Sequence, residues 1–182
     1  MQFLNPLAGV VNNQTGIFKY STQAQVLAAA TRTYLIGSKI AVPAGKLQIG
    51  TRLIWEFDIT KTAAGVATST YDVCFGTAGT TADSARLSFT KPAGTAVVDT
   101  GRIKISCLIR GPLSASGIAV GTFELVHNLA ATGHALIPCV TSTVVSAAFD
   151  VTTVGLQVGV CATTGAADAI TIQLVTASAD NL

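Results

Sequence analysis

Two histidines and a nearby cysteine have the clearest capacity for metal binding or acid–base chemistry. His127, His134 and Cys139 follow one another with six and four residues between them. Common zinc sites use closely spaced ligand pairs, and this spacing fits none of the common patterns. We interpret His127 as a residue at a strand end, in step with the apolar residues before it, and His134 as a loop residue. We therefore expect no metal site and no cofactor.

Acidic residues supply a second kind of candidate chemistry. Glu56 and Asp58 lie two residues apart and share one face of an expected strand. Glycoside cleavage needs two carboxyl groups at a defined separation, but nothing else in the sequence indicates a saccharide cleft. We interpret the two acids as a polar strip that pairs with Arg or Lys on a neighbouring strand. Asp72, Asp83 and Asp99 flank expected loops, yet no Asp-rich loop offers the six or more oxygens, roughly, of a calcium site.

Motifs for nucleophilic catalysis and phosphate binding are missing from the sequence. There is no G-x-S-x-G motif for an activated serine. The segment 76–80 (GTAGT) is rich in glycine, but it lacks the lysine and the following helix of a phosphate-binding loop and is typical of a tight turn. The sequence therefore predicts a protein that is not an enzyme.

The four cysteines are spread widely along the chain. Cys74, Cys107, Cys139 and Cys161 form no C-x-x-C pair. In a chain of 182 residues, such spacing is typical of small core residues or free thiols rather than a disulfide framework.

Alternation of apolar and polar residues is the strongest structural signal. In 52–60, Leu53, Trp55, Phe57 and Ile59 alternate with mostly polar residues, and Ile54 is the exception. Successive side chains of a strand point to opposite faces, so this segment predicts a strand with one buried face. Trp55 lies on that face and is expected in the core rather than on a sugar-binding surface.

The same alternation recurs along the rest of the chain. Further strands are expected at 34–42, 71–75, 86–90, 102–110, 122–125, 140–149, 156–160 and 170–174, with glycine- and proline-rich turns between them. About eight or nine such strands, with at most one short helical turn at 23–30, indicate an all-β antiparallel sandwich. The residues predicted to form its core are Leu53, Trp55, Phe57, Ile59, Val73, Phe75, Ile103, Ile105, Ile109, Phe123, Leu125, Leu156, Val158, Ile170, Ile172 and Leu174.

The composition indicates a protein whose surface is largely covered by neighbours. Only 11% of residues are charged and 49% are apolar, whereas charge normally keeps soluble proteins apart. The net charge is +2, and no cluster of Lys and Arg offers the phosphate contacts that nucleic-acid binding requires. The longest stretch free of charged residues, 125–149, is interrupted by His, Asn, Gly and Pro, so no membrane span is expected.

The first residues differ from the rest of the chain. Turn-forming residues and the lack of periodicity up to Gly16 suggest an irregular arm over 1–31, followed by one sandwich domain over 32–182. Such an arm can add a strand to a neighbour or wrap around it. The residues predicted to form this interface are Phe3, Leu4, Pro6, Leu7, Val10, Val11, Ile17, Phe18 and Tyr20.

Several segments resemble small jelly-roll structural proteins encoded among the head and tail genes of tailed bacteriophages. They are 40–50 (IAVPAGKLQIG), 61–65 (KTAAG), 75–89 (FGTAGTTADSARLSF), 99–102 (DTGR), 125–133 (LVHNLAATG) and 144–153 (VVSAAFDVTT). The resemblance covers most of 33–178 and rests on cadence and turn motifs. It implies a jelly-roll virion protein, and the widely spaced cysteines fit assembly in the host cytoplasm.

Three functions are open at this point. The first is a capsid decoration (cement) or head-fibre protein that packs as a homo-oligomer, expected to be a trimer, against the major capsid protein or other virion proteins. The second is a tail or baseplate adhesion module that binds a host receptor or glycan, which would need exposed aromatic residues in its loops. The third, a small sandwich enzyme, lacks the residues that catalysis requires.

Overall fold

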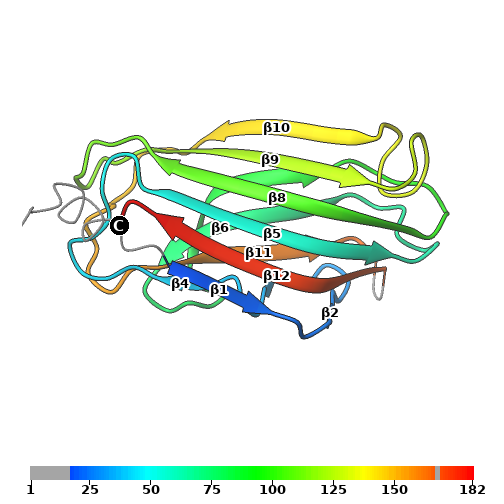
Figure 1. The fold of residues 1–182 in the computed structure, drawn as a ribbon, viewed down its shortest axis with the longest axis horizontal. Coiled ribbons are helices and arrows are strands. Elements are labelled where there is room, and N and C mark those ends of the chain that lie inside the picture. Colours follow the sequence, from blue (N-terminus) through cyan, green and yellow to red (C-terminus); the bar gives the residue numbers. More distant parts are fainter. Residues whose placement is uncertain (1–16, 167–168) are drawn as a thin grey trace, which may run out of the picture.

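The computed structural model describes residues 17–166 and 169–182, and these residues form two antiparallel β-sheets packed face to face (Figure 1). The predicted all-β antiparallel sandwich is confirmed. Nine strands have five or more residues: β1 (Ile17–Ser21), β5 (Arg52–Lys61), β6 (Ser69–Gly76), β7 (Ser84–Lys91), β8 (Asp99–Ile109), β9 (Ala119–His127), β10 (Cys139–Val145), β11 (Gln157–Thr164) and β12 (Ile170–Asp180). Three more have two residues each: β2 (Gln25–Val26), β3 (Thr33–Tyr34) and β4 (Ile40–Ala41).

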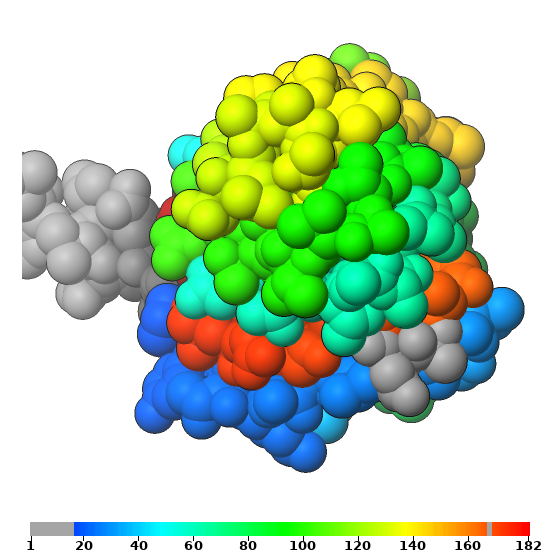
Figure 2. Space-filling view, turned by 90° about the vertical axis from the view of Figure 1, so that its right-hand side faces the viewer, coloured from blue at the N-terminus to red at the C-terminus, as the bar shows by residue number. Residues whose placement is uncertain are grey.

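The larger sheet runs in the order β1-β12-β5-β8-β9-β10, and β2 also pairs with β12. Viewed from the end of the sandwich, these strands follow one another from blue β1 at the bottom to yellow β10 at the top (Figure 2). The smaller sheet runs β3-β11-β6-β7, with β4 also paired to β11. The finer assignment as a jelly roll is not confirmed, since β8, β9 and β10 form a plain meander within one sheet.

The core lies between the two sheets and follows the alternation of the sequence. Every residue predicted for the core is buried except Leu174. Trp55 is fully buried, and its indole N–H donates a 2.7 Å hydrogen bond to the carbonyl of Ser38. This bond satisfies the one polar atom of a large apolar side chain, so Trp55 is a core residue as predicted.

Leu174 is displaced from the core by a β-bulge. The pairing of β12 with β5 shifts register between Ile172 and Leu174, so the face that each residue presents changes after Gln173. Val175 takes the buried position, and Leu174 is half-buried. The prediction for Leu174 was wrong because it continued the alternation of Ile170 and Ile172 through the bulge.

Other expected elements also differ in the structure, and the strand expected at 140–149 ends at Val145 as β10. The possible helical turn at 23–30 is instead extended and contains β2, which pairs with β12. The expected strand at 34–42 is divided into β3 and β4, since Gly37 adopts a φ of +89° between them. A side chain at Gly37 would also collide with Ser21, whose Cβ lies 2.5 Å from the position of an added Cβ.

The expected N-terminal arm joins the sandwich within its described part. From residue 17 to residue 31, the chain contributes β1 and β2 to one edge of the larger sheet. Phe18 and Tyr20 are exposed on β1, and Ile17 is half-buried. The other interface residues predicted, namely Phe3, Leu4, Pro6, Leu7, Val10 and Val11, lie outside the described residues.

Candidate functional site

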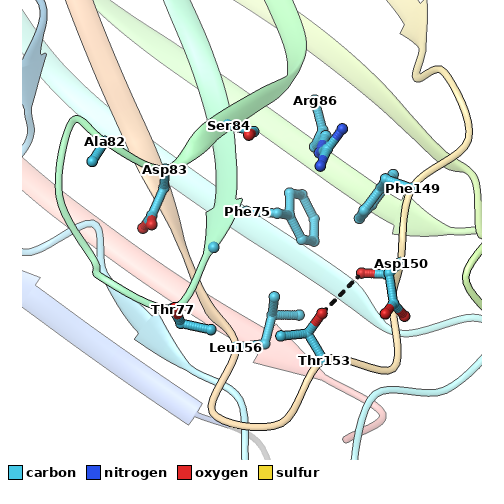
Figure 3. Close-up of a pocket in the computed structure, with 11 residues that line it drawn as sticks. Phe75, Thr77, Ala82, Asp83, Ser84, Arg86, Phe149, Asp150, Thr153 and Leu156 are labelled. Atoms are coloured by element: carbon cyan, nitrogen blue, oxygen red, sulfur yellow. Dashed lines mark hydrogen bonds between the residues drawn. The ribbon is translucent and has the colours of Figure 1, made fainter.

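A pocket of about 280 Å³ opens where β6, β7 and the loop after β10 meet (Figure 3). Phe75 comes from the end of β6, Arg86 comes from β7, and Phe149, Asp150 and Thr153 come from the loop. The pairing of β6 with β7 brings Phe75 and Arg86 together, and the loop after β10, which is distant in the sequence, adds the other three side chains.

A bulge in the pairing of β6 with β7 places Arg86 in the pocket. Val73 pairs with Leu87 and Cys74 pairs with Ala85, so Arg86 is an extra residue with no partner across the strand pair. Bulges of this kind redirect side chains near binding sites. The guanidinium carbon lies 5.0 Å from the ring centre of Phe149, within the range of a cation–π interaction.

The floor of the pocket consists of two aromatic rings in contact. Phe75 and Phe149 have ring centres 4.9 Å apart, and both side chains are almost fully buried. Because so little of either ring is accessible, they support Arg86 rather than offering a flat stacking platform. Recognition in this pocket would depend mainly on its polar groups.

Two carboxylates line the pocket, and they have different tasks. Asp83 accepts hydrogen bonds from the backbone N–H groups of Ala78, Gly79 and Thr80, so its carboxylate organises the preceding loop. The approach of Asp83 also requires a glycine at position 76, where an added Cβ would collide with the Asp83 carboxylate.

Asp150 is the carboxylate that remains accessible. It accepts hydrogen bonds from the N–H and the hydroxyl of Thr152, and these two bonds lower the pKa of its carboxyl group. The pocket thus presents one cation and one anion beside the hydroxyl of Thr153, a set suited to binding a polar ligand.

A second group of polar side chains is buried at one end of the sandwich. Lys61, Lys91, Asp99 and His127 occupy the last or first positions of their strands, on the core face, and all four are nearly inaccessible. The carboxylate of Asp99 accepts bonds from the ring Nδ1 of His127 (2.8 Å) and from the backbone N–H of His134 (2.9 Å). We call Lys61, Lys91, Asp99, His127 and His134 together the end cluster.

The end cluster ties two loops together, residues 92–98 and residues 128–138. The ammonium of Lys61 donates to the carbonyls of Thr95 (2.7 Å) and Val97 (2.5 Å), and that of Lys91 donates to the carbonyl of His134 (2.9 Å). Burial lowers the pKa of both lysines, that of Lys91 to about 8. These groups satisfy backbone carbonyls of the loops, which explains why two charged residues are retained in a buried position.

The Asp99–His127 pair resembles part of a catalytic triad in its contacts but is not arranged as one. The ring Nε2 of His127, which a nucleophile would need as its base, instead lies 2.7 Å from the carbonyl oxygen of Ile137. Both ring nitrogens therefore already have partners, and neither is free to act as the base of a nucleophile. The pair is arranged to hold a loop.

His134 is buried, and both of its ring nitrogens lack a hydrogen-bond partner among the described residues. Burial lowers the pKa of His134 to about 4, so the ring is neutral at pH 7. Within residues 17–166 and 169–182, no group of three or more His, Cys, Asp or Glu side chains is arranged to hold a metal ion.

Cys74 and Cys161 form a buried thiol pair on the outer face of the smaller sheet, beneath Arg32. The hydrogen bond between the two thiols, followed by burial, raises the pKa of Cys74, while the same bond lowers the pKa of Cys161. Arg32 donates to Cys74 Sγ (2.9 Å) and to Asp72 (3.2 Å), which attaches the segment before β3 to β6. All four cysteines are free, as the sequence predicted, and Cys139 alone among them is exposed.

The acidic strip on β5 is paired across the sheet, as the sequence predicted. Glu56 lies opposite Lys104 on β8 with an N–O distance of 3.5 Å, and Asp58 lies opposite Arg102 at 3.1 Å. All four side chains are partly exposed, and their charges compensate one another.

No family model and no curated protein sequence matches this chain. Among solved structures, it is similar to a protein of unknown function from Shewanella oneidensis MR-1, with 11% identity, a TM-score of 0.40, and 100% of this chain and 96% of that one covered. It is also similar to a Bacillus endospore appendage (14% identity, TM-score 0.33, covering 93% and 90%). A third is the CBM2 module of the evolved Dit of Lactobacillus casei BL23 phage J-1 (7%, 0.33, covering 79% and 69%).

Proposed function

We propose that this chain is a structural, non-enzymatic component of a tailed-phage particle, a capsid decoration or head-fibre protein. It acts by packing against copies of itself and against other virion proteins, including the major capsid protein. The proposal places the protein in the virion, after assembly in the host cytoplasm. The phage assignment rests on the resemblance of the sequence segments described above.

The outer face of the larger sheet is the observation that carries the packing role. The register places Phe18, Ser178, Ile54, Ser106, Thr122 and Thr143 side by side, so one row crosses all six paired strands of this face without a charge. Exposed apolar residues flank the row, among them Tyr20, Leu108 and Val145. Beside the row lie the ion pairs of β5 with β8, and also the exposed Glu124 opposite Lys104 and the exposed Arg52 opposite Asp180, so the surface proposed for packing is the uncharged row with its apolar neighbours.

The arm provides the first test of this proposal. Deleting residues 1–16 is expected to prevent binding to the particle while the β-sheet signal in circular dichroism stays unchanged. Binding would be followed by co-sedimentation with particles that lack the protein. Unchanged binding by the shortened chain would refute a docking role for these residues, and absence of the full chain from mass spectra of purified virions would refute the function itself.

The pocket beside Arg86 supports a second candidate, an adhesion module that binds a host receptor or glycan. A guanidinium, an accessible carboxylate and a hydroxyl within one concavity match the polar groups of a saccharide or another polar ligand.

The pocket is tested by replacing Arg86 with Ala in a glycan-array experiment followed by titration of any glycan bound. Loss of one charged hydrogen bond should weaken binding about 10-fold or more. Arg52→Ala is the matched control, because Arg52 is exposed on β5 of the other sheet. Equal binding by the two variants would exclude the pocket as the site.

A further inference from the structure

Strand β10 leaves one edge of the larger sheet without a partner. It pairs with β9 on one side, and no other described strand pairs with it. Figure 1 shows it as the outermost strand on its side of the molecule. Its seven residues read CVTSTVV, with no charge, no proline and no break in register with β9.

Proteins usually protect such an edge against pairing with another chain. Lysine, proline, bulges and very short strands are the common devices. The other described edges use them: β1 carries the exposed Lys19, β7 contains the bulge at Arg86, and β3 and β4 have two residues each. Strand β10 has none of these devices, and its Val- and Thr-rich composition favours strand pairing.

The backbone of β10 presents a regular set of free donors and acceptors at this edge. The N–H of His127 bonds to the carbonyl of Pro138, and the N–H of Ser146 bonds to that of Ala119. The N–H and C=O groups of successive residues point to opposite sides of a strand. Those of the even-numbered residues of β10 therefore point towards β9. The N–H and C=O groups of Cys139, Thr141, Thr143 and Val145 consequently point away from the molecule.

The sequence of β10 is a palindrome about Ser142. Residues 140–144 read Val-Thr-Ser-Thr-Val in either direction. Two copies paired antiparallel about a two-fold axis at Ser142 would place Val140 opposite Val144, and Thr141 opposite Thr143. Paired Thr residues and paired β-branched residues are favourable cross-strand neighbours. In this register, the outward-pointing groups of each strand face those of the other and form about eight backbone hydrogen bonds.

The side chain of Ser142 provides an independent indication of the same axis. Its hydroxyl is buried and has no hydrogen-bond partner among the described residues. At the two-fold axis, Ser142 forms a pair that exchanges no backbone bonds with its symmetry mate, the closest type of cross-strand pair. The two hydroxyls then lie on the same face and can bond to each other, as Ser106 and Thr122 do at 2.6 Å within the chain.

We infer that β10 is a self-association site, where a second copy of this chain adds its own β10 antiparallel about a two-fold axis at Ser142, and the larger sheet becomes continuous across the dimer. The inference does not depend on a role in phage particles. The contact is also separate from the trimer expected from the sequence, and an assembly with two-fold and three-fold axes can contain both.

A disulfide placed on the axis tests the register. Ser142→Cys, in a chain with Cys139→Ser to remove the exposed thiol, should give a covalent dimer under mild oxidation on non-reducing gels. Closest cross-strand pairs have Cα atoms about 4.5 Å apart, which suits a disulfide. Thr141→Cys in the same background is the matched control, because its symmetry mate lies diagonally, roughly 7 Å or more away. Equal cross-linking of both variants, or of neither, would overturn the proposed register.

Charge repulsion tests the contact without any cross-link. Thr141→Lys with Thr143→Lys places lysines opposite lysines at this register, on exposed positions that leave the β9 pairing intact. In sedimentation experiments, the dimer dissociation constant Kd of the variant should be about 30-fold or more above that of the native chain. A native chain that stays monomeric at about 100 μM, or a variant Kd equal to the native one, would refute the inference.

Discussion

Replacing Asp99 with Ala is expected to lower the free energy of unfolding by about 3 to 5 kcal/mol, because it leaves several buried hydrogen-bond donors without their acceptor. The carboxylate of Asp99 is inaccessible and accepts bonds from the ring of His127 and from the backbone N–H groups of Thr100 and His134. Without it, these donors remain buried and unpaired. For a chain of this size, Tm should fall by roughly 10 °C.

Asp58→Ala is the matched control for this prediction. The carboxylate of Asp58 also has a partner on a neighbouring strand, the guanidinium of Arg102, but both of these side chains are substantially exposed. Exposed pairs contribute about 1 kcal/mol or less, so its Tm should change by only a few degrees. Thermal unfolding followed by circular dichroism compares the two variants, and equal losses would contradict the role assigned to the end cluster.

Acid is expected to destabilise the protein through His134. Burial lowers the pKa of this ring to about 4, from an ordinary value near 6.5. Between these two values, the unfolded chain binds a proton that the folded chain does not, so stability falls as the pH drops from 6.5 towards 4. The difference between the two pKa values corresponds to a loss of about 3 kcal/mol of stability over this pH range.

The ionisable groups around His134 shift the pKa of its ring in both directions. The carboxylate of Asp99 favours protonation of the ring, whereas Lys91, His127 and Lys61 oppose it, and burial is the largest effect. Burial alone would raise the pKa of Asp99. The hydrogen bonds that its carboxylate accepts outweigh burial and hold this pKa below its usual value. The stability that the ionised Asp99 carboxylate contributes is present above a pH of about 4 and is lost as the pH falls below this value.

The variant His134→Leu isolates this effect. The backbone N–H that binds Asp99 and the carbonyl that binds Lys91 both remain, so only the unpartnered ring is removed. Leu is close to His in volume, which keeps the packing. The variant should be at least as stable as the native chain at pH 7 and should lose much less stability between pH 6.5 and pH 4.5. Parallel urea unfolding curves for both proteins across that range would count against the prediction.

The sandwich could be predicted from the sequence because alternation is a local property. In β5, Leu53, Trp55, Phe57 and Ile59 face the core as their spacing predicts. The ion pairs of Glu56 and Asp58 followed from the same alternation, since polar residues on the outer face need partners across neighbouring strands. Leu174 shows the limit, because a bulge depends on how two strands pair rather than on one strand alone.

Part of the end cluster was also within reach of the sequence. Lys61 and Lys91 continue the buried alternation of β5 and β7 by one further residue, and Asp99 and His127 stand in step with the core residues of β8 and β9. That step places each of them on the inner face. It does not show that the four strand ends meet, because their mutual contacts depend on the order of strands in both sheets.

The sequence and the tertiary structure each decide a different part of this protein's architecture and chemistry. The sequence by itself determined the all-β class, the inward positions of the core and the lack of familiar catalytic motifs, since each depends on residues a few positions apart. Only the tertiary structure decided that His127 and His134 meet at Asp99, that Arg86 lies over Phe149, and which strand is left unpaired at the edge. These contacts join residues distant in the chain, and sheet pairing and packing bring them together.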